Sequence, residues 1–151
     1  MRFKENQKQM RKLLFIFAII LTFACKKNNG SNNDLTNYDW TLSTATVTPA
    51  MTVNGKLETN YRIVQSGCIG AEVKFTFLND GTYRFSAGGP ACDYWNSPEQ
   101  TYSRTGNEIS LKNGSSTSVF NLVNNELRNI ATHQINNITH TVEYVYIRKA
   151  K

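Results

Sequence analysis

The side chains most capable of chemistry in this 151-residue chain are three cysteines and two histidines. They are Cys25, Cys68, Cys92, His133 and His140. No Cys-x-x-Cys or His-x-x-x-His spacing groups them as metal ligands, and no serine stands in the Gly-x-Ser-x-Gly turn that exposes a nucleophile. The sequence therefore predicts a protein without enzymatic activity, cofactor or bound metal.

Cys25 follows a segment that has the parts of a secretory signal. Five basic residues precede residue 13, residues 13–23 are nearly all apolar, and Ala24 precedes the cysteine. The apolar run is shorter than the roughly 20 residues that span a bilayer. Residues 21–25, Leu-Thr-Phe-Ala-Cys, resemble the lipobox of bacterial lipoproteins, in which the cysteine is acylated and becomes the mature N-terminus. The alternative is an ordinary signal peptide with an incidental cysteine, and translation can start at Met1 or Met10.

The lipobox resemblance implies where the protein is located. Residues 1–24 would be a lipoprotein signal peptide, and Cys25 would carry acyl chains such as palmitate. Residues 25–34 are polar and predict a flexible tether. Two acyl chains hold a protein stably on a membrane. We expect a lipid anchor in the bacterial cell envelope, with the outer membrane favoured and the domain in the periplasm or on the cell surface.

The net charge of +6 belongs mostly to the signal segment. Five of the 17 basic residues and one of the 11 acidic residues lie within residues 1–24, so the rest of the chain carries a net charge of +2. Such a balance gives no support to nucleic-acid binding. Residues 35–151 are long enough for one domain. The sequence does not indicate the oligomeric state.

Alternating apolar and polar residues predict an all-β domain. In residues 72–86, Val73, Phe75 and Phe77 share one face, Asn79-Asp80-Gly81 predicts a tight turn, and Tyr83 and Phe85 return on the same face. Further strands are expected at residues 38–44, 51–53, 61–64, 100–104, 108–112, 118–123, 126–130 and 139–148. Turn signals about every ten residues favour a small antiparallel up-and-down β-barrel of eight or nine strands. No helix is predicted after the signal.

The remaining two cysteines flank the hairpin of residues 72–86. Disulfides persist outside the cytoplasm, so a Cys68–Cys92 bridge is expected to join the open ends of this hairpin. Metal binding or two free thiols are the alternatives. His140 is expected on a solvated or barrel-lining strand face, and His133 in an Asn-rich connection.

Several segments resemble the bacterial lipocalin-like lipoprotein domains. The resemblance rests on residues 35–42 with Trp40, on Cys68, on the Phe-Thr-Phe-Leu-Asn-Asp-Gly-Thr-Tyr hairpin at 75–83, on Cys92 and on residues 102–111. It extends from about residue 35 to 149 and implies a small β-barrel.

Two groups of aromatic residues are candidates for binding a small apolar or amphipathic ligand. Tyr94 and Trp95 follow Cys92, and a bridge there would hold them near one end of the barrel. Phe75, Phe77, Tyr83 and Phe85 point inward. The alternatives are that Trp95 folds back as a lid on the core and that the inward rings are ordinary core. The protein would then be a structural or protein-interaction lipoprotein with a solid barrel.

Overall fold

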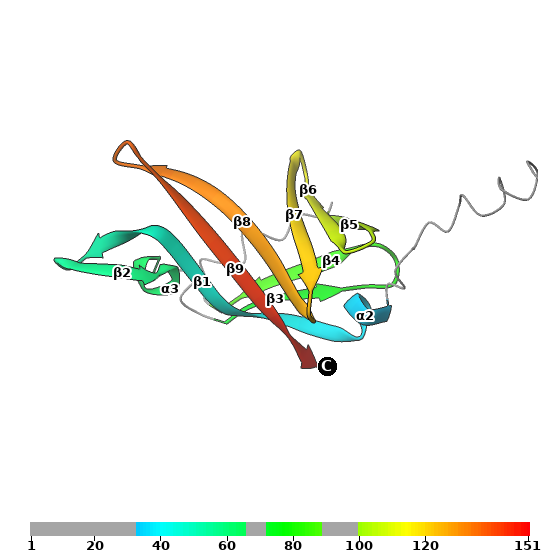
Figure 1. The fold of residues 1–151 in the computed structure, drawn as a ribbon. Coiled ribbons are helices and arrows are strands. Elements are labelled where there is room, and N and C mark those ends of the chain that lie inside the picture. The colour runs from blue at the N-terminus through cyan, green and yellow to red at the C-terminus, as the bar shows by residue number, and fades with distance from the viewer. Residues whose placement is uncertain (1–32, 66–71, 89–99) are drawn as a thin grey trace, which may run out of the picture.

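The computed structural model describes residues 33–65, 72–88 and 100–151. The predicted signal peptide and Cys25 lie outside the described residues, as do Cys68, Cys92, Tyr94 and Trp95. The described chain forms one antiparallel sheet of nine strands that curves into a nearly closed barrel (Figure 1). The prediction of an all-β, up-and-down barrel is confirmed.

The strands follow one another around the barrel nearly in chain order. They are β1 (Tyr38–Val53), β2 (Lys56–Asn60), β3 (Val73–Phe77), β4 (Tyr83–Ala87), β5 (Gln100–Thr105), β6 (Glu108–Asn113), β7 (Ser116–Val123), β8 (Glu126–Ile135) and β9 (Ile138–Ala150). Their order in the sheet is β4-β3-β1-β9-β8-β7-β6-β5, and β2 pairs with β1 outside this path. Two helices of four residues, α2 (Asn33–Thr36) and α3 (Tyr61–Val64), complete the described elements.

Strand β1 is one bent strand of 16 residues, and the prediction of separate strands at 38–44 and 51–53 was wrong. The long partner β9 pairs with it from Tyr38 to Thr48, so its backbone stays extended across the polar stretch. The register shifts between Leu42 and Thr44, where an irregularity bends the strand. Beyond this bend, β1 continues into a hairpin with β2.

The predicted strand at residues 61–64 is the helical turn α3 instead, and the prediction of no helix after the signal was also wrong. Asn60 begins the turn, because its side chain accepts a hydrogen bond of 3.1 Å from the backbone N–H of Arg62. Tyr61 is buried beneath the turn. Four residues are too few for alternation to separate a strand from a helical turn.

The hairpin predicted at residues 72–86 forms as β3 and β4. Phe77 pairs with Tyr83 at the closed end of the ladder. The turn is held by Asp80, whose carboxylate accepts hydrogen bonds from the backbone N–H and the hydroxyl of Thr82 at 2.9 and 2.6 Å. Gly81 has a φ of 84°, which the predicted Asp-Gly turn requires.

The barrel wall is weakly joined at two seams in the described part of the chain. Between β4 and β5 a single bridge, Thr82↔Thr101, is supported by the backbone N–H of Tyr102 donating to Gly81 at 2.8 Å. Strands β7 and β8 pair only over the three residues next to their turn, from Val123↔Glu126 to Asn121↔Arg128. Beyond that point the two strands diverge (Figure 1).

One end of the barrel is closed by α2. Leu35 and Trp40 are fully buried there, and the indole N–H of Trp40 donates to the Leu35 carbonyl at 3.1 Å. Asp34 forms an ion pair with Arg104 of β5, whose side chain is 7% exposed. Because these contacts join α2 to two strands, this end has a fixed plug.

We predict that Trp40→Phe lowers the free energy of unfolding by about 2–3 kcal/mol, because it removes buried ring atoms and leaves the Leu35 carbonyl without its donor. Urea denaturation measures this loss. The matched control is Ile130→Ala, whose side chain is 67% exposed and should change stability by less than about 0.5 kcal/mol. Equal stability of Trp40→Phe and the unsubstituted protein would show that the plug does not depend on this bond.

Candidate functional site: a cavity in the open half of the barrel

The half of the barrel away from α2 contains a cavity of about 560 Å³. Its apolar wall consists of Leu42, Val73, Phe75, Tyr83, Phe85, Leu111, Phe120, Tyr144 and Tyr146. Its polar wall consists of Gln65, Gln100, Asn113, Ser116, Ser118, Asn129 and His133. The strand alternation that buries one face of each strand therefore also builds the cavity.

Phe75 is the centre of the apolar wall. Its ring centroid lies 5.1 Å from those of Phe85 and Tyr146, 5.5 Å from that of Phe120 and 5.9 Å from that of Tyr83. These separations are typical of favourable aromatic pairs. The rings come from four strands, β3, β4, β7 and β9, so the cluster ties opposite walls of the barrel together.

Burial changes the ionisation of the tyrosines in this wall. Burial raises the pKa of Tyr144 to about 12, with a smaller contribution from nearby Tyr61. The pKa of Tyr146 is raised further, again chiefly by burial and then by Tyr144. Burial also raises the pKa of Tyr83. All three phenols therefore stay neutral at physiological pH.

His133, in the polar wall, is a residue whose predicted position was wrong. His133 lies in strand β8, opposite His140 of β9, rather than in a connection. Its ring stacks on Tyr61 of α3 with centroids 5.8 Å apart. Its Nε2 atom is buried and has no hydrogen-bond partner in the structure.

His140 has a different environment from its neighbour. His140 is 4% exposed and lies on the inward face of its strand. Of the two positions predicted for it, the solvated face and the barrel-lining face, it occupies the second. Its Nδ1 lies 3.0 Å from the carbonyl oxygen of Pro49. Because a carbonyl only accepts, Nδ1 carries the hydrogen in this contact. His140 is therefore part of the packing between β1 and β9.

The described residues that flank residues 66–71 and 89–99 lie at the cavity end of the barrel. Gln65 and Gln100 line the cavity itself. The N–H of Gly88 donates to the carbonyl of Glu72 at 3.0 Å, so these two chain positions lie side by side beyond the β3–β4 ladder. Cys68, Cys92, Tyr94 and Trp95 themselves lie outside the described residues.

Among the four predicted aromatic residues within the described part, three line the cavity and one does not. Phe75, Tyr83 and Phe85 are in its wall. Phe77 is fully buried nearer the plugged end, where its ring lies 5.0 Å from that of Tyr102. Sequence reasoning missed the polar wall, although alternation from Phe120 already places Ser118 and Ser116 on the inward face.

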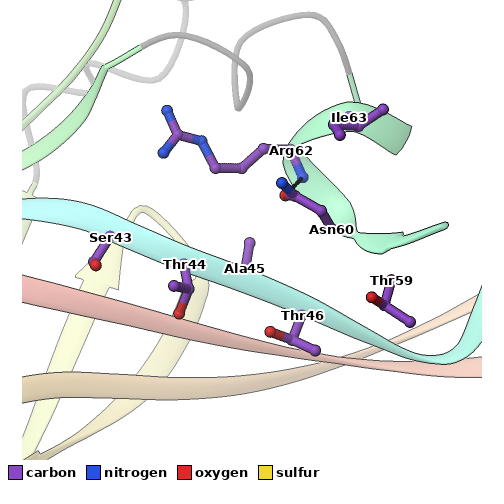
Figure 2. Close-up of a pocket in the computed structure, with 8 residues that line it drawn as sticks. All are labelled: Ser43, Thr44, Ala45, Thr46, Thr59, Asn60, Arg62 and Ile63. Carbon is purple, nitrogen blue, oxygen red and sulfur yellow. Dashed lines mark hydrogen bonds between the residues drawn. The ribbon is translucent and has the colours of Figure 1, made fainter.

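A second hollow, of about 480 Å³, lies on the outside of the barrel between β1 and α3 (Figure 2). Strand β3 pairs with β1 as far as Thr41, and β2 resumes pairing at Thr46, so neither strand pairs with the edge of β1 between them. The hollow is lined by Ser43, Thr44, Thr46 and Thr59 among others, and Arg62 extends over it from α3. It is smaller and more polar than the interior cavity.

The described residues contain no group of three or more His, Cys, Asp or Glu side chains that could hold a metal ion. No helix among them is long and apolar enough to cross a membrane.

The chain matches no protein-family model, no curated protein and no solved structure. The geometry of the cavity is therefore the basis for a functional proposal.

We predict that stability falls as the pH rises above about 10, and that Tyr146→Phe reduces this fall. An unfolded tyrosine ionises near pH 10, whereas the pKa of Tyr146 is raised by burial, so above pH 10 the unfolded state loses its proton first. The contribution of Tyr146 is complete below pH 10 and declines by about 1.4 kcal/mol per pH unit above it. Urea midpoints at pH 9 and 11.5 measure the effect; identical declines in both proteins would contradict it.

Proposed function

We propose that this protein is a non-enzymatic, lipocalin-like lipoprotein of the bacterial cell envelope that binds a small apolar or amphipathic molecule inside its barrel. The observation that carries the proposal is the cavity of about 560 Å³ with its aromatic wall. Ligand sites are typically clefts of roughly 300–1,000 Å³ lined by apolar and aromatic side chains with a few polar groups. This cavity has that size and composition.

The main alternative is a structural or interaction protein with a solid barrel. Barrels of eight strands are narrow enough for their own side chains to fill the interior. The plugged half is filled in this way by Leu35, Trp40 and Phe77, which are all fully buried. In the other half, inward positions of β7 carry the small residues Ser116 and Ser118. The difference between the two halves favours a binding role.

A blocking substitution tests the binding role. Ser118→Trp should lower the affinity for the uncharged dye Nile red by about tenfold or more, because an indole would occupy the cavity. Thr117→Trp is the matched control, since Thr117 is the exposed neighbour on the same strand and lies outside the cavity lining. Fluorescence titration measures both affinities. Equal binding by the two variants, or no binding by the unsubstituted protein, would contradict the proposal.

The lipid anchor rests on the lipobox-like sequence before Cys25. The first described helix, α2, begins at Asn33 at the plugged end of the barrel, so the tether would leave from the end opposite the cavity. A membrane-attached chain would thus keep its cavity accessible.

We predict that Cys25→Ser shifts the protein from the membrane fraction to the soluble fraction, or leaves its signal segment uncleaved. The reason is that the substitution removes the thiol that would be acylated. Cell fractionation with immunodetection and the mass of the mature chain measure both effects. An unchanged mass and unchanged membrane association would rule out lipidation at this position.

A Cys68–Cys92 disulfide is proposed to close the open end of the β3–β4 hairpin. Each cysteine lies four residues beyond one of the hydrogen-bonded positions Glu72 and Gly88. Four residues reach roughly 13 Å from each position, which allows the Cα separation of about 4.4–6.8 Å that a disulfide needs. The proposed bridge would also keep Tyr94 and Trp95 close to the cavity.

We predict that the unreduced Cys25→Ser protein contains no free thiol, and that Cys68→Ser with Cys92→Ser lowers its free energy of unfolding by about 2–4 kcal/mol. Thiol titration of the unfolded protein and urea denaturation measure these quantities. Two titratable thiols in the unreduced protein would refute the bridge.

A further inference from the structure

The interior cavity has no formal charge among its described lining residues. None of them is Asp, Glu, Lys or Arg, and their polar groups are amides, hydroxyls and the ring of His133. Several charged side chains pair with one another elsewhere. Examples are Asp39 with Lys74, and Arg128 with Glu126 and Glu143. An ionised ligand group would therefore meet no opposite fixed charge from the described lining.

Uncharged polar side chains line the cavity on both strands that border the gap between β7 and β8. Ser118 comes from β7, and Asn129 comes from β8. Asn129 crosses the gap, because its amide Nδ2 donates to the carbonyl of Val119 at 2.7 Å. Burying a polar group of a ligand costs free energy unless the group is hydrogen-bonded, and these two side chains can supply the hydrogen bonds.

We infer that the cavity takes an electrically neutral amphipathic molecule. Its hydroxyl, ester or amide group hydrogen-bonds with Ser118 and Asn129 at the gap between β7 and β8, and its apolar body lies against Phe75 and its neighbouring rings. Burial of an ionised carboxylate without an opposite charge is far more costly than burial of a hydroxyl that is hydrogen-bonded. This inference rests on the proposed binding function and adds the charge class of the ligand.

The test compares two ligands with the same twelve-carbon chain, dodecan-1-ol and dodecanoate. Each displaces Nile red at pH 8 from the full chain carrying Cys25→Ser. We expect dodecan-1-ol to bind at least about tenfold more tightly than dodecanoate. Ser118→Lys, which adds an ammonium group at the gap, should reduce or abolish the preference by strengthening dodecanoate binding about tenfold. Thr117→Lys adds the same charge to the outer face and should leave the preference unchanged.

The outcomes separate this inference from the proposed function. Dodecanoate binding as tightly as dodecan-1-ol, or more tightly, overturns the neutral-ligand inference while binding as such still stands. Equal effects of Ser118→Lys and Thr117→Lys overturn the assignment of the polar group to the gap. Failure of Nile red and both twelve-carbon ligands to bind overturns the proposed function itself.

Discussion

Strand β1 is the structural element that determines the arrangement of the others, because its backbone is shared among three partners. It pairs with β9 along most of its length, with β3 on its first half and with β2 on its second half. The register shift against β9 between Leu42 and Thr44 bends the strand between the stretch that pairs with β3 and the stretch that pairs with β2. The barrel closes on one side of this bend, and the β1–β2 hairpin extends beyond it on the other.

The contrast between the two halves of the barrel follows from the size of the inward side chains. Near α2, large buried side chains fill the interior, Asp34 pairs with Arg104, and the indole N–H of Trp40 bonds to the Leu35 carbonyl. In the other half, the wall opens where β7 and β8 stop pairing, and small polar residues face inward there. A core in which every inward position was apolar and large would be more stable. The open half gives up that stability, as expected for a binding site.

Much of the fold could be predicted because local signals agreed with the tertiary structure. In β3 and β4, strict alternation and an Asp-Gly turn specified both the hairpin and its inward rings, and the structure confirms them. The continuity of β1 could not be predicted, because the polar residues after Leu42 interrupt the alternation, and only the pairing with β9 keeps them extended. Similarly, α3 depends on the capping side chain of Asn60 and on the burial of Tyr61.

The candidate site was predictable only in part. Alternation identifies which residues face inward, and so it identified Phe75, Tyr83 and Phe85. It does not distinguish a filled level of the barrel from a hollow one, which is why Phe77 was grouped with them although it lies in the filled half. The polar wall depends on the divergence of β7 and β8, and this in turn depends on pairings between distant strands. His133 was misplaced because the hairpin of β8 and β9 extends further than the apolar pattern indicates.

Native mass spectrometry of the protein, isolated in mild detergent from its own host, tests most directly whether the barrel binds a small molecule. We expect a population heavier than the protein alone by the mass of one small molecule, which is released on unfolding and carries no ionised group. A single species with the mass of the protein alone, together with no small molecule in the organic extract, would contradict this expectation.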